Sequence, residues 1–136
     1  MIIINFAHPL TPLHLTQVRA IVGLDIDRVV DVPTQVDFSL PIMPQVVEFV
    51  NATGISGRDW QTMALVVNPP GFSFLAVALA TELHGRCGYF PAHIRMRPVP
   101  DAAIRQFEVA EVVDMQKVRE QARVRREHAD ETEWRK

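Results

Sequence analysis

Two stretches of this 136-residue chain decide its fold: Met1-Ile2-Ile3-Ile4-Asn5-Phe6-Ala7, running into His8-Pro9-Leu10-Thr11-Pro12, and Met63-Ala64-Leu65-Val66-Val67, running into Asn68-Pro69-Pro70-Gly71. In each, an apolar run enters a short loop that a helical pattern follows. Apolar runs without polar alternation are typical of strands buried on both faces. Such corners place backbone N–H groups and helix N-termini at one edge of a parallel sheet, where phosphate ligands usually bind.

The rest of the chain alternates in the same way. Helices are predicted at residues 12–22, from about 41 to 54, and at 72–84, with a short turn at 56–60; further strands are predicted at 28–32, 92–97 and 107–113. This order predicts an α/β fold, a small Rossmann-like and mostly parallel sheet with helices on both faces. If the first strand lies between the second and third, the crevice between the first and third is the expected binding place.

The C-terminal segment differs from the rest in charge. Residues 1–116, predicted to be the ligand-binding domain, hold seven Lys/Arg and eleven Asp/Glu, a balance of −4, whereas residues 117–136 hold seven and five, a balance of +2. The dense mixture of charges predicts either a solvated helix or a disordered tail. A helix that frays toward Lys136 is the favoured interpretation.

Bulk properties exclude several classes of protein. A net charge of −2 argues against duplex DNA or RNA as the main partner. No apolar run reaches the ~18 residues of a membrane span, and residues 2–4 follow no basic segment, so they predict a strand rather than a signal peptide. The one cysteine, Cys87, excludes an internal disulfide and fits the reducing cytoplasm.

Standard catalytic and cofactor motifs are absent from the sequence. There is no GxGxxG, no GxxxxGK[ST], no paired CxxC, no HExxH and no GxSxG. The histidines lack ligand spacing, so neither a metal site nor a cofactor is expected. They are His8, His14, His84, His93 and His128. The spacing of Gly85 and Gly88 fits a GxxG loop or, more simply, a helix C-cap.

Each of the two loops has a structural and a functional interpretation. The first is a tight turn in which Thr11 caps a helix, or a ligand contact through His8 and Thr11. The second is a rigid turn, or a stiff wall against which a flat base packs, with Asn68 reading a base edge or a ribose. Gly71 would let the backbone approach the ligand, and Ser73 would cap the next helix or contact phosphate.

Basic residues alternate along residues 92–97, where His93, Arg95 and Arg97 are expected on one face. That face predicts either a solvent-facing edge strand or an interface or phosphate clamp. The predicted ligand-binding residues are Phe6, His8, Thr11, Asn68, Pro69, Pro70, Gly71, Ser73 and Arg95.

These residues also carry a family resemblance. The opening from Ile3 to Thr11, the Asn-Pro-Pro-Gly loop, and residues 82–86 with 88–91 resemble a small CRISPR-associated group, the Csx family numbered fifteen, found beside type III CRISPR systems. The resemblance covers about residues 1–100. It implies a CARF-like Rossmann fold, usually homodimeric, that binds cyclic oligoadenylate, the messenger of type III defence.

The resemblance leaves three functions open. The first is a homodimer, assembling further on ligand binding in one version, that binds cyclic tetra-adenylate and lowers its free level by sequestration. The second is a metal-independent ring nuclease, in which His8 or Thr11 helps a ribose 2′-hydroxyl attack the adjacent phosphate. The third is a protein-interaction subunit without a ligand. Binding ranks first because no pair of residues stands out as acid and base.

Overall fold

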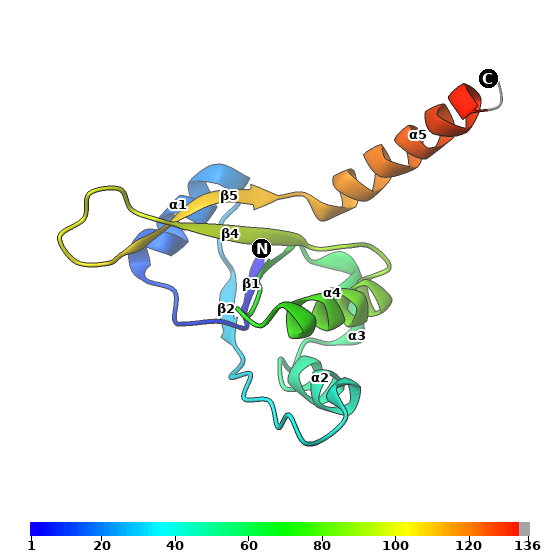
Figure 1. Cartoon of the computed structure of the whole chain (residues 1–136). Coiled ribbons are helices and arrows are strands. Elements are labelled where there is room, and N and C mark those ends of the chain that lie inside the picture. Colours follow the sequence, from blue (N-terminus) through cyan, green and yellow to red (C-terminus); the bar gives the residue numbers. More distant parts are fainter. Residues whose placement is uncertain (134–136) are drawn as a thin grey trace.

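One five-stranded sheet organises the chain. The structure, a computed structural model, describes residues 1–133, and the backbone alone for residues 130–133. The strand order is β2-β1-β3-β4-β5, with β1, β2, β3 and β4 parallel and β5 antiparallel to β4 (Figure 1). The chain thus reverses its winding direction between β1 and β3, which confirms the predicted mostly parallel α/β fold and its switch point.

The elements follow the predicted alternation. They are β1 (Ile2–Asn5), α1 (Pro12–Val22), β2 (Arg28–Asp31), α2 (Ile42–Asn51), α3 (Gly57–Thr62), β3 (Leu65–Asn68), α4 (Ser73–Cys87), β4 (Ala92–Pro98), β5 (Phe107–Val113) and α5 (Met115–Glu133). The predicted fraying toward Lys136 concerns residues 134–136, which lie outside the described part of the chain.

Several predicted boundaries are wrong, and each for a local reason. Met63 does not begin β3; its N–H donates to the carbonyl of Asp59, so it closes α3 instead. Asn68, predicted in the loop, is the last residue of β3 and pairs with Asn5. Gly85 lies inside α4, and Gly88 alone is the C-cap, at φ +80°. A C-cap at Gly88 confirms the simpler interpretation of this glycine pair over a GxxG loop.

Helices cover both faces of the sheet and bury two apolar layers. On one face α2, α3 and α4 pack their buried side chains against Ile2, Ile4 and Val67. On the other, Val18 of α1 packs against Ile3 and Val66. Alternate residues of β1 and β3 therefore point to opposite layers, as expected for strands buried on both faces.

Two parts extend beyond the layers. The β4–β5 hairpin reaches past the end of α1, and α5 projects away from the domain (Figure 1). Since β5 runs antiparallel to its neighbours, its start lies at the carboxyl edge of the parallel strands and its end at the opposite edge. In residues 1–133, no helix combines the length and apolar character that a membrane crossing requires.

The packing of α4 on the sheet gives a stability prediction. Leu83 is 0% exposed, whereas Val77 on the same helix is 66% exposed. Leu83→Ala should lower the free energy of unfolding by about 2–5 kcal/mol because it removes buried methylenes and leaves a cavity. Val77→Ala, the matched control, should change it by no more than about 0.5 kcal/mol. Urea denaturation measures both; equal effects would contradict this packing.

Candidate functional site

Asn5, the last residue of β1, ties together the carboxyl ends of three strands. Its Nδ2 donates to the backbone carbonyl of His8 and to Asp31 Oδ1 of β2, both at 2.9 Å. Its Oδ1 accepts from the Ala7 N–H at 3.1 Å and from Asn68 Nδ2 of β3 at 2.9 Å. Asn5 is only 2% exposed. The amide thus uses both of its donors and both acceptor lone pairs, which fixes its orientation.

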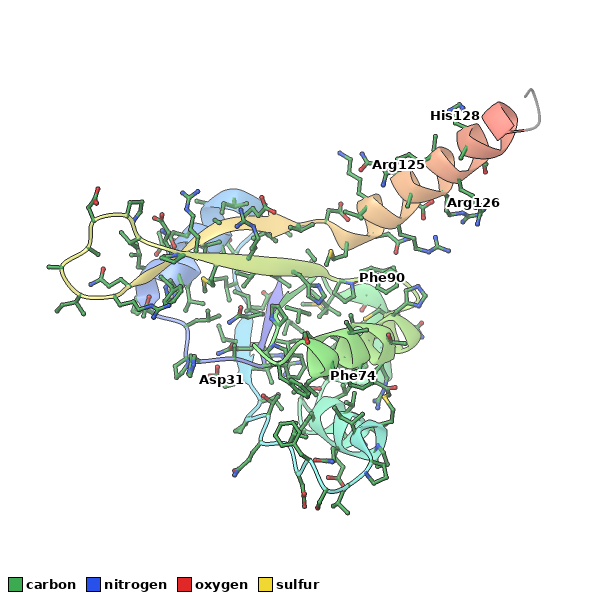
Figure 2. All side chains as sticks on the ribbon, in the orientation of Figure 1. Asp31, Phe74, Phe90, Arg125, Arg126 and His128 are labelled. Atoms are coloured by element: carbon green, nitrogen blue, oxygen red, sulfur yellow. The ribbon has the colours of Figure 1, made fainter. Side chains whose placement is uncertain are left out.

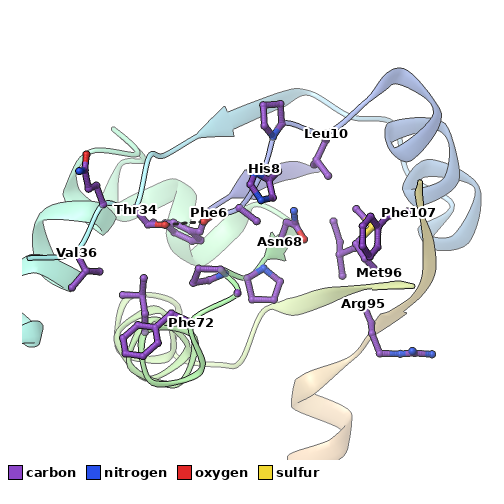
Figure 3. Close-up of a pocket in the computed structure, with 18 of the residues that line it drawn as sticks. Phe6, His8, Leu10, Thr34, Val36, Asn68, Phe72, Arg95, Met96 and Phe107 are labelled. Atoms are coloured by element: carbon purple, nitrogen blue, oxygen red, sulfur yellow. Dashed lines mark hydrogen bonds between the residues drawn. The ribbon is translucent and has the colours of Figure 1, made fainter. Parts of the chain in front are cut away.

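Backbone groups strengthen the same junction. The Phe6 N–H donates to the Asn68 carbonyl at 3.0 Å, and the Val32 N–H donates to the Asn5 carbonyl at 2.9 Å. The Thr34 hydroxyl donates to the Phe6 carbonyl at 3.0 Å, the dashed line in Figure 3. The loops that follow β1, β2 and β3 are therefore held together as one rim.

A cavity of about 1050 Å³ lies over this rim (Figure 3). Small-molecule sites usually measure ~300–1,000 Å³, so this one suits a ligand larger than a single nucleotide. In Figure 3 it extends from Val36 and Phe72 at one end to Met96 and Phe107 at the other, with Asn68 between them.

The structure brings most of the predicted site residues into this cavity. Those that line it are Phe6, His8, Asn68, Pro69, Pro70, Gly71 and Arg95. Thr11 does not line it: its hydroxyl caps α1 by accepting from the His14 N–H at 3.3 Å. Ser73 does not line it either; it is the first residue of α4, where Phe72 occupies the N-cap without a side-chain cap bond.

Other lining residues were missed from the sequence. They are Ala7, Pro9, Leu10, His14, Thr34, Gln35, Val36, Phe38, Phe72, Leu75, Ile94, Met96 and Phe107. The loop that contains Thr34 and Phe38 had been read as a polar connection only. It follows the carboxyl end of a parallel strand, the same signal that identified the other two loops.

The cavity has apolar walls and few polar groups. Pro69 and Pro70 form part of one side, and Phe72 meets Phe38 edge to face, with ring centroids 5.3 Å apart. The Asn68 amide turns its nitrogen to Asn5, so its Oδ1 is left without a partner. Every fully buried side-chain polar atom of the described residues has a partner, so this oxygen is accessible. It presents an acceptor that suits an N–H donor of a ligand.

Positive charge is sparse around the cavity. Arg95 is its one arginine, and the cavity has no lysine. The guanidinium points away from the centre and pairs with Glu111 of β5 at 3.3 Å (Figure 3). Both side chains are about half exposed, so the pair is weak enough for the guanidinium to exchange partners. The N-terminus of α4 adds unsatisfied backbone N–H groups beside Gly71 and Phe72.

The two histidines of the cavity differ in role. His14 Nδ1 accepts from the Thr11 N–H at 3.1 Å, so its Nε2 carries the proton and donates to the Phe107 carbonyl at 2.8 Å. His14 therefore joins α1 to β5. The exposed His8 ring has no hydrogen-bond partner among the described residues. Within residues 1–133, no three His, Cys, Asp or Glu side chains gather to hold a metal ion.

The basic residues of β4 do not share one solvent-facing edge, contrary to one of the two interpretations of this strand. β4 lies between β3 and β5, and His93 is only 8% exposed. Arg95 and Arg97 are exposed and pair across the hairpin, Arg97 with Glu108 at 2.9 Å. The His93 Nδ1–H donates to the Pro91 carbonyl at 2.9 Å. Burial lowers the pKa of His93, against the raising effect of that hydrogen bond.

The Asn5 junction gives a second prediction. Asn5→Ala should lower the free energy of unfolding by at least about 2 kcal/mol, because it strands several buried polar groups at once. Ser39→Ala removes an exposed hydroxyl that donates to Asp37, and should change it by no more than about 0.5 kcal/mol. Chemical denaturation checks the pair, and a neutral Asn5→Ala would contradict the role of this amide.

Burial of His93 predicts a pH dependence. Because its pKa in the folded state lies below the ordinary value of 6.5, the unfolded chain binds its proton first as the pH falls. The contribution of neutral His93 is thus complete above pH 6.5 and is lost progressively below it. Wild type should lose more stability than His93→Gln over the first pH unit below that value. Parallel losses in thermal melts would contradict the prediction.

Comparison with known proteins found no relative: no family model, no curated protein and no solved structure matches the chain. The resemblance to the Csx family therefore stays a prediction. The function is argued from the geometry of the cavity.

Proposed function

We propose that this chain binds cyclic oligoadenylate, cyclic tetra-adenylate in particular, and lowers its free level by sequestration. The observation that carries the proposal is the cavity of about 1050 Å³ at the switch point of the sheet, with flat apolar walls and one accessible acceptor. The proposal takes its ligand class from the sequence resemblance and its site from this cavity.

The walls suit nucleobases. Pro69 and Pro70 offer a flat, rigid surface, and Phe38 and Phe72 supply aromatic rings at the same side of the cavity. Stacking of a base on an aromatic side chain is worth ~1–3 kcal/mol and requires no charge. A site with this lining gains affinity from bases more than from phosphates.

Asn68 suits adenine among the bases. Its accessible Oδ1 accepts a hydrogen bond, and the N6 amine of adenine donates one at the base edge. Because Asn5 fixes the Asn68 amide, this preference for a donor is built into the folded chain. Uracil and its O4 acceptor would meet an acceptor at the same point and be disfavoured.

Sparse charge favours a shared ligand. A cyclic tetranucleotide carries four phosphates, while one cavity offers Arg95 and the N–H groups at the start of α4. Two copies of the chain around a two-fold axis would double these groups over a ring that has its own rotational symmetry. We therefore expect one ring for two chains.

Holding the ligand is better supported than cutting it. Acid–base catalysis needs a group that is held in place and tuned by its neighbours. His8 has no orienting partner among the described residues, and His14 is engaged at both ring nitrogens. The cavity thus lacks a positioned base.

Two matched pairs of variants test the site. Phe72→Ala should weaken cyclic tetra-adenylate binding about tenfold or more, since it removes a stacking surface. Arg95→Ala should weaken it by about fivefold. The controls are Phe74→Ala, an exposed neighbour outside the cavity, and Arg97→Ala, the next ion-paired arginine of β4; both should bind as wild type. Isothermal titration calorimetry gives affinity and stoichiometry.

Outcomes of the same titration separate the functions. Intact ligand recovered after incubation, at one ring for two chains, supports sequestration. Linear product ending in a 2′,3′-cyclic phosphate would replace it with ring nuclease activity. Absence of binding at micromolar protein would overturn the proposal and leave the protein-interaction function.

A further inference from the structure

Helix α5 is the one long element that lies outside the packed domain. It runs from Met115 to Glu133 and projects from the edge of the sheet opposite the cavity (Figures 1 and 2). Its first turns are anchored: Gln116 Oε1 accepts from the Phe90 N–H at 3.0 Å, and Val118 lines a small hollow beside α4. Every side chain from Glu120 to Ala129 is exposed.

The charges of α5 are segregated along its length. The first part, residues 115–126, holds five basic residues and one acidic residue, a balance of +4. They are Lys117, Arg119, Arg123, Arg125 and Arg126, with Glu120. The second part, residues 127–133, holds four acidic residues and no lysine or arginine, a balance of −4 with histidine neutral. They are Glu127, Asp130, Glu131 and Glu133.

This order of charges opposes the stability of a lone helix. The helix dipole favours acidic residues near the N-terminus and basic residues near the C-terminus. The first turn of α5 has no acidic residue and its last turn no basic one. A solvated helix of this length without tertiary packing is itself marginal in water. Arg123, Arg125 and Arg126 make no ion pair with a described residue, and Figure 2 shows the latter two extending into solvent.

We propose that α5 pairs with the α5 of a second copy of this chain, antiparallel. Antiparallel pairing sets the +4 part of each helix against the −4 part of the other, whereas parallel pairing sets like charges together. A two-fold axis through the middle of α5 satisfies both copies at once. Val118, Ala122 and Arg125 lie along one face, because they are spaced by four and three residues, and the small Ala122 lets the helices approach.

A nucleic acid is a poorer occupant of the same helix. Phosphates attracted to Arg123, Arg125 and Arg126 would meet the acidic turns that follow directly. The pairing also leaves the cavity open, since α5 begins at the opposite edge of the sheet. The proposal is therefore independent of the ligand and of the proposed function.

Charge exchange tests the pairing on the full chain without ligand. One variant carries Arg123→Glu, Arg125→Glu and Arg126→Glu; the other carries Glu127→Lys, Asp130→Lys and Glu131→Lys. Each alone should raise the dimer dissociation constant at least about tenfold in sedimentation equilibrium. An equimolar mixture of the two should recover the dimer, which a misfolded variant would not do. The control, Arg19→Glu with Arg58→Glu, alters exposed arginines outside α5 and should leave the dimer intact.

Salt should act in the same direction. In 1 M salt the Debye length falls to about 3 Å, so the wild-type dimer should weaken markedly. A wild type that is monomeric at ~100 μM and low salt, a dimer that both variants retain, or a mixture that stays monomeric would each overturn the proposal. A mixture shift produced only by added RNA would replace the second copy with a nucleic acid.

Cysteine cross-linking tests the orientation. Near the middle of α5, Ala122→Cys should form a disulfide between copies under oxidising conditions. Val118→Cys should not, because antiparallel helices with a 1.5 Å rise per residue separate these two positions beyond the ~7 Å limit of a disulfide. Burial raises the pKa of the native Cys87 thiol to about 11, so it does not compete. Cross-linking at Val118→Cys and not at Ala122→Cys would overturn the antiparallel order.

Discussion

One buried amide, that of Asn5, sets the geometry on which the site depends. Asn5 ends the central strand β1, and its side chain reaches β2, β3 and the loop that follows its own strand. A buried amide that loses these partners is penalised by its desolvation, with no water to replace them. A shift of any of the three strands by one residue would break the junction. The rim of the cavity therefore inherits its shape from the register of the sheet.

The fold was largely predictable because it rests on periodicity. Apolar runs, short loops and helical stripes fixed the order of the elements and the switch point between β1 and β3. Local patterns failed where a tertiary partner decides. Asn68 resembles a loop residue by its type, but it belongs to β3 because Asn5, distant in the sequence, accepts from its side chain. Met63 is apolar like a strand residue, yet it closes α3.

The site was predictable to the extent that it follows one rule, that ligands lie beyond the carboxyl ends of parallel strands. The rule located the corners at His8 and Asn68. It would also have located the loop of Thr34, which a polar composition concealed. Phe107 could not be found in this way, because it reaches the cavity through the antiparallel hairpin. Thr11 shows the reverse case: the local capping chemistry that the sequence suggested uses its hydroxyl.

The two sides of the cavity are held by different means. Pro69 and Pro70 are constrained by their own rings, whereas the loop of Phe38 is held through Gln45, whose amide accepts from the Asp37 N–H and donates to the carbonyls of Asp37 and Pro41. Covalent stiffness costs no entropy when a ligand arrives, but a loop held by exposed hydrogen bonds loses freedom on ordering. The lifetime of a complex in this cavity is thus governed by the Phe38 loop, while the proline side serves as the fixed template against which the ligand is first aligned.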